Sequence, residues 1–243
     1  MNDLVLTVLY DNYPANPELK TSWGFSCLVQ GGDKVILFDT GGEDGILMDN
    51  MASLGINPAE IDIIILSHSD WDHVGGLDSF LEKNSRVKVY LLASFPQNIK
   101  NKVEKYGGEI VEVTGPVDII KGFFSTGELG NGKKEQALGI ITEKGLVVIT
   151  GCAHPGVENM VESAIKCSEK NPLLVIGGFH FFTQLFPFFG KTQKAIKKLH
   201  ELKTRYVAPC HCTGKMGISA FKKSFGKYFI PTGVGSVIKV SEL

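Results

Sequence analysis

Five of the six histidines in the chain stand directly after the end of an apolar, strand-like run. His68 and His73 follow the run at 61–67, and the others each follow a later run of their own: His154, His180 and His211. In an α/β sheet the carboxyl ends of parallel strands meet at one edge, where ligand sites form. The pattern therefore predicts that imidazoles from distant segments converge on one sheet edge. His200, within the amphipathic segment 191–203, is expected to be a partly exposed structural residue.

Early strand-like runs form hairpins, such as 25–30 with 34–40 across a Gly-Gly-Asp turn, whereas later runs alternate with helical periodicity. Strands are expected within 4–10, 25–30, 34–40, 61–67, 87–93, 108–113, 137–151, 172–178, 205–210 and 236–240. Helices are expected within 45–56, 77–84, 96–107, 156–170, 191–203 and 218–226. This mixture indicates a layered α/β protein. Since no linker or low-complexity segment divides it, residues 1–243 are expected to form a single domain.

Composition restricts the classes of partner. With 43% apolar residues, 21% charged residues and a net charge of −1, the chain gives no reason to expect nucleic acid or an acidic membrane. No apolar run approaches the roughly 20 residues that cross a bilayer, and the N-terminus lacks the marks of a signal peptide. Five irregularly spaced cysteines favour reduced thiols. We therefore expect a cytoplasmic protein that acts on a small-molecule substrate, with homo-oligomer formation left open.

A dense cluster of metal-binding side chains follows the run at 61–67. Within six residues it contains His68, Asp70, Asp72 and His73. Neutral imidazole and carboxylate are the usual ligands of first-row divalent metals. A zinc knuckle at the Cys-His-Cys triplet 210–212 is disfavoured, because no second cysteine pair lies at a suitable spacing. The sequence predicts a catalytic site for one or two divalent ions: zinc, or iron or manganese.

These segments resemble the metal-site motifs of the metallo-β-lactamase fold. The matching segments are ILFDTGG (36–42), SHSDWDHVGG (67–76), TGCAHPG (150–156), GGFH (177–180) and PCHCTG (209–214). Together with Asp11-Asn12 and WGFS at 23–26, the later segments are similar to one branch, the dihydropterin–ribofuranosylaminobenzene-phosphate synthase-like proteins. The resemblance runs from about residue 4 to the C-terminus. It implies an αββα sandwich of two mixed sheets packed face to face, with helices outside and metals at one edge.

The resemblance also implies two sets of metal ligands. The first set is His68, Asp70 and His154, and the second is Asp72, His73 and His211. Asp39 matches a buried aspartate of the family, which would orient the ligand loop through hydrogen bonds.

Two positions depart from the family pattern. Asp70 stands where the family has His. A carboxylate there could coordinate the metal and favour iron or manganese, as in flavodiiron oxidoreductases of this fold. Alternatively, the shorter side chain could fail to reach the metal. His180 stands where the general fold has a bridging Asp. Because one imidazole nitrogen has a single lone pair, it cannot bridge two cations, and His180 would be a terminal ligand or a proton donor.

A dinuclear centre can lower the pKa of a water and polarise a carbonyl or phosphoryl oxygen. The primary hypothesis is metal-dependent hydrolysis of an ester, lactone, thioester or phosphodiester, or a pterin-related transfer as the branch implies. Asp72 would orient the water and His180 would protonate the leaving group. The alternatives are a diiron redox or oxygen-handling protein and a degenerate member that binds a ligand without turnover.

Residues 127–134 (GELGNGKK) match the spacing of a phosphate-binding P-loop, but Lys134 replaces the required Ser or Thr. The segment also lies between strand-like runs, so a glycine-rich hairpin loop is expected instead.

The phenylalanine-rich stretch 177–190 would either cover the core, form a dimer contact, or make an aromatic wall for a planar substrate. Phe186 and Phe188 are the candidate substrate contacts. Three cysteines that flank these motifs are assigned no catalytic role, with a thiolate ligand left open: Cys152, Cys210 and Cys212.

Overall fold

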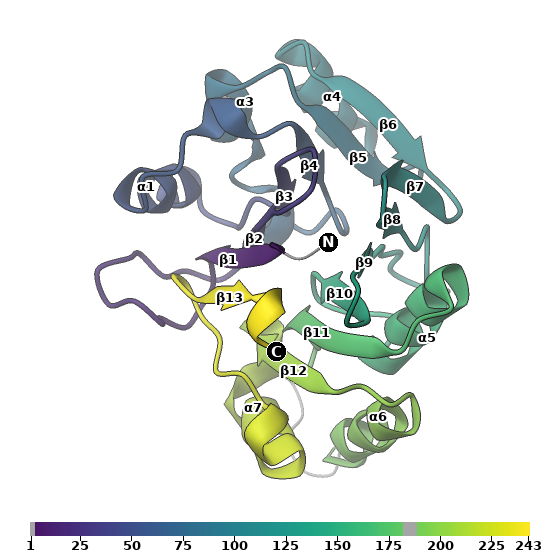
Figure 1. Cartoon of the computed structure of the whole chain (residues 1–243). Helices are drawn as coiled ribbons and strands as arrows, with labels where there is room; N and C mark the ends of the chain where they lie inside the picture. The colour runs from purple at the N-terminus through teal and green to yellow at the C-terminus, as the bar shows by residue number, and fades with distance from the viewer. Residues whose placement is uncertain (1–2, 182–188) are drawn as a thin grey trace.

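Two mixed sheets lie face to face, and helices cover the outer face of each sheet (Figure 1). The computed structural model describes residues 3–181 and 189–243. Within these ranges the first sheet has the strand order β13-β1-β2-β3-β4-β5-β6. Its strands are β1 (Val5–Tyr10), β2 (Ser26–Gln30), β3 (Ile36–Phe38), β4 (Ile63–Ile65), β5 (Lys88–Leu92), β6 (Glu109–Val113) and β13 (Val237–Lys239). The expected αββα sandwich is confirmed.

The second sheet has the order β12-β11-β10-β9-β8-β7. Its strands are β7 (Val117–Ile120), β8 (Phe123–Ser125), β9 (Leu138–Ile141), β10 (Leu146–Thr150), β11 (Pro172–Gly178) and β12 (Tyr206–Cys210). The antiparallel pair β7–β8 is absent from the sequence expectations, because these strands are short and only a Lys-Gly turn separates them. The hairpin of β2 and β3 is confirmed by the pairing of Cys27 with Phe38.

Strand direction explains where the site forms. β3, β4, β5 and β6 are parallel neighbours in the first sheet, and β10, β11 and β12 are parallel neighbours in the second. All residues of β10 and β11 are buried, as expected for parallel strands that are covered on both faces. The carboxyl ends of each parallel set therefore lie at one edge of their sheet.

Helices appear in each segment where the sequence predicts them. They are α1 (Ile46–Ser53), α3 (Leu77–Lys83) and α4 (Gln97–Lys105) beside the first sheet, and α5 (Val157–Ser168), α6 (Phe189–Glu201) and α7 (Gly214–Phe225) beside the second. The shorter ones are α2 (Trp71–Val74), η1 (Pro58–Glu60), η2 (His211–Thr213), η3 (Gly226–Tyr228) and η4 (Val240–Glu242). In the part of the chain that the structure covers, none of these helices has the length and apolar character of a membrane span.

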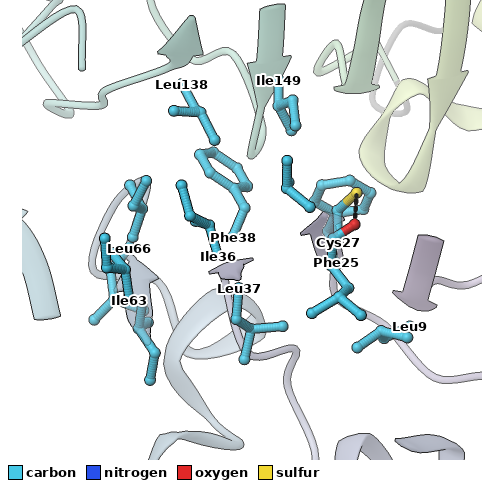
Figure 2. Close-up of a cluster of buried hydrophobic side chains, with 14 of the residues drawn as sticks. Leu9, Phe25, Cys27, Ile36, Leu37, Phe38, Ile63, Leu66, Leu138 and Ile149 are labelled. Carbon is cyan, nitrogen blue, oxygen red and sulfur yellow. Dashed lines mark hydrogen bonds between the residues drawn. The ribbon is translucent and has the colours of Figure 1, made fainter. Parts of the chain in front are cut away.

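Two apolar clusters hold the layers together. The larger one includes the space between the sheets, where Leu138 and Ile149 of the second sheet join Phe38 of the first (Figure 2), and it extends to the helices α1, α3 and α4. The smaller one lies between the second sheet and α5–α7, and includes Val148 and Phe221. Because both faces of the second sheet are packed, the ends of its strands are held firmly where the histidines follow.

Candidate metal centre

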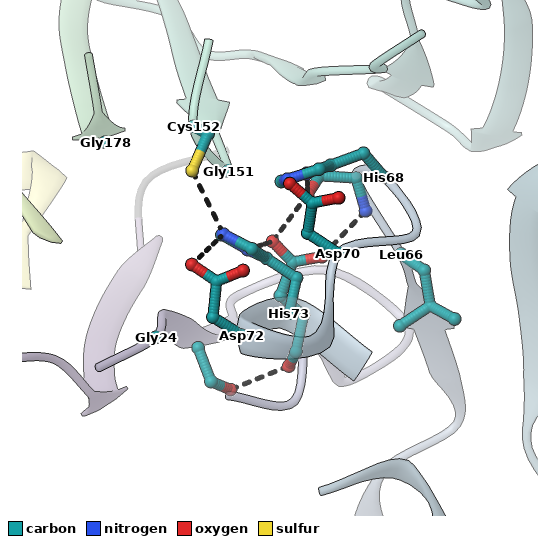
Figure 3. Close-up of polar contacts among 12 residues, drawn as sticks. Gly24, Leu66, His68, Asp70, Asp72, His73, Gly151, Cys152 and Gly178 are labelled. Atoms are coloured by element: carbon teal, nitrogen blue, oxygen red, sulfur yellow. Dashed lines mark hydrogen bonds and ion pairs between the residues drawn. The ribbon is translucent and has the colours of Figure 1, made fainter. Parts of the chain in front are cut away.

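The loop after β4 brings four polar side chains together before and within α2. His68 and His73 are fully buried, and their ring centroids lie 4.2 Å apart. Asp70 Oδ2 lies 3.4 Å from His68 Nε2, and Asp72 Oδ2 lies 3.6 Å from His73 Nε2 (Figure 3). The four clustered residues of the sequence motif are therefore neighbours in space.

Histidines from the second sheet meet this loop. His154 follows β10 and its ring lies 4.7 Å from that of His68, while the ring of His211, after β12, lies 5.1 Å from that of His73. His180 follows β11, 4.3 Å from the ring of His154. The five imidazoles predicted to converge do so.

His200 lies elsewhere, as expected. It is exposed on α6, where its ring stacks on Phe225 and its Nε2 lies 2.9 Å from Ser224 Oγ.

Each of the carboxylates Asp70 and Asp72 lies close to two of the imidazoles with which the sequence resemblance groups it. In the first group, Asp70 Oδ2 lies 3.4 Å and 3.8 Å from the Nε2 atoms of His68 and His154. In the second group, Asp72 Oδ2 lies 3.6 Å and 3.2 Å from the Nε2 atoms of His73 and His211.

Asp70 also accepts hydrogen bonds from Lys133 at both carboxylate oxygens. Burial by itself would raise the pKa of Asp70, but His68 and Lys133 lower it well below its usual range. Lys133 belongs to the glycine-rich loop 127–134, which contacts the site although it is no P-loop. The sequence did not single out this lysine.

Asp39 positions two of the histidines. Its Oδ2 lies 2.7 Å from His73 Nδ1, and Ser67 donates from its backbone N and its Oγ to the two Asp39 oxygens, each at 2.7 Å. Ser67 Oγ lies 2.8 Å from His68 Nδ1. The Ser67 hydroxyl donates its hydrogen bond to Asp39, so its Oγ accepts a hydrogen bond from the Nδ1–H of His68. The Nε2 lone pair of His68 therefore faces the centre. Burial raises the pKa of Asp39 to about 8, against the opposing effect of His68 and Ser67.

Glu135 holds His154 in the same way. This fully buried carboxylate accepts the backbone N–H of His154 at 2.9 Å and lies 3.0 Å from His154 Nδ1. Its other oxygen accepts the backbone N–H groups of Gly151, Cys152 and Ala153 at 3.1, 2.9 and 2.8 Å. Burial opposes ionisation, but His68 and His154 lower the pKa of Glu135 to about 2. Sequence reasoning missed this residue, because nothing local distinguishes it from the exposed acids nearby.

His211 is held by the segment that follows β1. Its Nδ1 lies 3.0 Å from Asn12 Oδ1, and its backbone N donates to Asp11 Oδ2 at 3.2 Å. Burial raises the pKa of Asp11 to about 7 and lowers the pKa of His211 to about 4. Trp23 Nε1 donates to Asp72 Oδ2 at 2.9 Å. Three residues that entered the sequence analysis only through the resemblance, Asp11, Asn12 and Trp23, therefore have direct contacts with the site.

The arrangement of nitrogens fits a metal ion. In each of the four imidazoles, an oxygen lies beside Nδ1 and Nε2 faces the cluster: His68, His73, His154 and His211. Acceptors at Nδ1 leave the Nε2 lone pair for a cation, as in metal-ligating histidines generally. Among the residues described, none makes a hydrogen bond with the buried Nε2 of His68. An imidazole nitrogen buried in this way is expected where a cation binds.

The backbone is turned sharply at the strand ends. Asp39, His180 and His211 have φ values of 57°, 55° and 46°, a region that costs non-glycine residues about 1–3 kcal/mol each. Gly151 allows the end of β10 to approach the ligand loop, because a Cβ there would lie 2.1 Å from Ser67 Oγ. These conformations aim the side chains at the centre.

Cys152, for which the sequence left a role as thiolate ligand open, lies among the donor atoms. Its Sγ is 3.2 Å from His73 Nε2 (Figure 3) and 3.4 Å from His211 Nε2. Burial raises the pKa of this thiol well above its ordinary value, with the hydrogen bond to Cys212 acting in the same direction. All five cysteines of the chain are free.

A cavity of about 670 Å³ opens beside His154 and His180. It lies where α5 and α6 begin, and its lining includes Phe181, Lys191 and Lys194. Burial and then the nearby His154 lower the pKa of His180 to about 4, so its imidazole is neutral at pH 7.

The phenylalanine-rich stretch is only partly described. Phe179 and Phe181 pack on Phe221 of α7, at centroid distances of 5.2 and 6.0 Å, which supports a core role for this part. Phe186 and Phe188, the candidate substrate contacts, lie outside the described residues.

Comparisons with known proteins agree with this arrangement. Residues 24–211 match the family model of the metallo-beta-lactamase superfamily. The chain is 31% identical to the 7,8-dihydropterin-6-methyl-4-(beta-D-ribofuranosyl)-aminobenzene-5'-phosphate synthase of Methanocaldococcus jannaschii, over 98% of this chain and 97% of that protein.

Solved structures show the same similarity. One is Tm1679, a metal-dependent hydrolase of the beta-lactamase superfamily, with a TM-score of 0.82, 27% identity and coverage of 97% of this chain and 98% of that one. The metallo-beta-lactamase fold protein YhfI of Bacillus subtilis shares the fold at a TM-score of 0.69 and 18% identity, over 97% of this chain and 99% of that one.

Proposed function

This chain belongs to the metallo-beta-lactamase superfamily, and on that premise we propose that it is a metal-dependent enzyme that acts on a small molecule. The observation that carries the proposal is the set of imidazoles whose Nε2 atoms face one centre while an oxygen lies beside each Nδ1. A side-chain cluster that served only stability would gain nothing from leaving the buried Nε2 of His68 without a hydrogen bond.

The proposed ligands form two positions at the edge where the sheets meet. The first position would be held by His68 and His154 with Asp70, and the second by Asp72, His73 and His211. Divalent cations bound there would polarise a carbonyl or phosphoryl oxygen and lower the pKa of a water to near neutrality.

The remaining residues suit the reaction that such a site performs. Burial by itself would raise the pKa of Asp72, but His211 and His73 lower it well below its usual range, so the side chain is an anion at neutral pH. Trp23 fixes one of its oxygens. His180, with a pKa of about 4, is better suited to accept a proton or bind a metal than to donate a proton at pH 7.

We propose hydrolysis of an ester, lactone, thioester or phosphodiester as the reaction. The cavity beside His154 and His180 would hold the substrate, with Lys191 and Lys194 opposite an anionic group and Phe181 against an apolar part. Because Glu158 also lines this cavity, we propose a small molecule that carries an anionic group on one part of its surface.

The Methanocaldococcus jannaschii relative supports a second candidate function. That protein is named a synthase of a pterin-linked aminobenzene phosphate, and the similarity spans almost all of both chains. A pterin-related transfer would use the same cavity and the same metal positions, with an arylamine in place of water as the nucleophile.

The first test is metal content. Protein purified without added zinc would be compared by elemental analysis with His68→Ala and His73→Ala, and with His200→Ala as the matched control. We expect the first two variants to lose metal and the control to retain it, because His200 stacks on Phe225 away from the cluster. Unchanged metal content in the His73→Ala variant would contradict the proposal.

The second test separates the reactions. Metal-loaded protein would be assayed with anionic esters, lactones, thioesters and phosphodiesters, and with a pterin and an arylamine together. Turnover that requires the arylamine would favour transfer over hydrolysis. Visible and EPR signals of a redox-active iron pair in aerobically purified protein, without turnover of these substrates, would favour the diiron alternative instead.

A further inference from the structure

Cys152 lies at the junction of the proposed metal positions. It follows β10 directly, two residues before His154, and its side chain points into the imidazole cluster (Figure 3). Three separate groups of potential ligand atoms include it, each with all atoms within 4.8 Å of one another. In the first group Cys152 lies with Asp72, His73 and His211. In the second it lies with His68 and His154, and in the third with His180 and Cys212. We propose that the Cys152 thiolate is a metal ligand shared by both positions, an inference that rests on the proposed metal centre.

The distances around the second position match a tetrahedral coordination sphere. With bonds of about 2.3 Å to sulfur and about 2.0 Å to nitrogen or oxygen, a tetrahedral zinc ion places sulfur and nitrogen about 3.5 Å apart, and nitrogen and oxygen about 3.3 Å apart. Cys152 Sγ lies 3.2 and 3.4 Å from the Nε2 atoms of His73 and His211. Asp72 Oδ2 lies 3.6 and 3.2 Å from the same two nitrogens. Four of the six distances among these atoms are therefore close to those of one tetrahedral site, and the other two pairs lie within 4.8 Å.

The first position supplies an independent observation. His68 Nε2 is fully buried, and no residue in the described ranges makes a hydrogen bond with it. His68 and His154 form a group of potential ligand atoms with the Cys152 sulfur, whereas Asp70 forms a group with His68 and Asp72. Both oxygens of Asp70 accept hydrogen bonds from Lys133. The sulfur of Cys152, by contrast, has no ion pair that competes with a metal ion among the described residues.

Sharing between two cations follows from the chemistry of sulfur. A thiolate has several lone pairs and can bind two cations, whereas each imidazole nitrogen has one. The sequence resemblance places His180 where the general fold has a bridging carboxylate, and one imidazole nitrogen cannot take that role. The Cys152 thiolate can.

The proton balance of the step is simple. The S–H bond breaks, the sulfur–metal bond forms, and one proton leaves to solvent for each thiol that binds. No electrons are transferred. Because thiolate is a soft ligand, we expect the site to prefer zinc over manganese, opposite to the preference that Asp70 alone would favour.

The test uses Co²⁺ in place of the native metal, because a cobalt–thiolate bond gives a near-ultraviolet charge-transfer band that nitrogen and oxygen ligands do not. Metal-free wild type would be titrated with Co²⁺ alongside Cys152→Ser. The matched controls are Cys212→Ser, a buried thiol in the same region, and Cys167→Ser, an exposed one. We expect the band in wild type and in both controls, and its complete loss in Cys152→Ser.

The outcomes separate this inference from the proposed function. If wild type binds no Co²⁺, the proposed metal centre itself is wrong. If wild type binds Co²⁺ without a charge-transfer band, or if Cys212→Ser and not Cys152→Ser removes the band, the assignment of Cys152 is overturned while the metal centre stands. Zinc K-edge EXAFS gives a second readout, because a sulfur neighbour at about 2.3 Å should be present in wild type and in Cys212→Ser and absent in Cys152→Ser.

Discussion

Glu135→Gln replaces one oxygen of a buried carboxylate by an NH₂ group and leaves its size unchanged. The carboxylate accepts four backbone N–H groups and faces His154 Nδ1. An amide has a single oxygen. If that oxygen takes the three N–H groups of 151–153, the NH₂ group must face the N–H of His154 at 2.9 Å, where two donors oppose each other.

The same change alters the tautomer of His154. Facing an NH₂ donor, Nδ1 must accept a hydrogen bond instead of donating one. The ring proton therefore moves to Nε2, the atom that lies 3.8 Å from Asp70 Oδ2 in the cluster. A protonated Nε2 cannot bind a metal. Loss of such an orienting partner typically weakens metal binding about 10–100-fold, or about 1.4–2.7 kcal/mol. The unsatisfied buried N–H also lowers the free energy of unfolding by about 1–3 kcal/mol.

Two measurements check these magnitudes. Competition with a chromophoric chelator gives the metal affinity, and urea denaturation of the metal-free protein gives the free energy of unfolding. Glu104→Gln is the matched control, since this carboxylate is exposed on α4 and neither quantity should change. A Glu135→Gln variant with the metal affinity of wild type would refute the role of Glu135 in orienting His154.

Three further results are expected. Asp39→Asn should weaken metal binding about 10–100-fold, because an amide cannot accept from Ser67 at both positions and also from His73; calorimetric titration with unchanged affinity would contradict this. Gly151→Ala should lower the free energy of unfolding by about 1–3 kcal/mol, because the new Cβ would lie 2.1 Å from Ser67 Oγ, and thermal denaturation at an unchanged Tm would show that the ligand loop moves freely. In the metal-free protein, His211 should stay neutral as the pH falls from about 7 to about 5, since burial lowers its pKa to about 4; an NMR titration midpoint near 6.5 would refute this.

The layered fold followed from local patterns with few exceptions. Strong apolar runs such as 172–178 appear as buried strands, and the amphipathic segment 156–170 appears as α5, because burial against a sheet reinforces the local preference. The missed β7 and β8 are short, and their pairing depends on neighbours in the sheet more than on their own residues. α7 begins at Gly214, four residues before the predicted start at 218, and Thr213 at its N-cap makes no capping hydrogen bond through its side chain.

The convergence of histidines was also accessible to sequence reasoning. Each follows an apolar strand, and the rule that parallel strands end at one edge brings His154, His180 and His211 together without coordinates. The residues that hold them were not accessible. Glu135, Ser67 and Lys133 carry no local pattern, and their side-chain contacts span up to 63 residues of sequence.

The sequence by itself determined which chemistry is available: imidazoles and carboxylates at strand ends, in an order that resembles one family. Tertiary structure decided which atoms meet. Cys152 adjoins an ordinary buried strand when read along the chain, yet its sulfur lies 3.2 Å from a nitrogen 79 residues away. The physical reason is that backbone periodicity sets the direction of a side chain within its own element, whereas the packing of two sheets sets what that side chain faces.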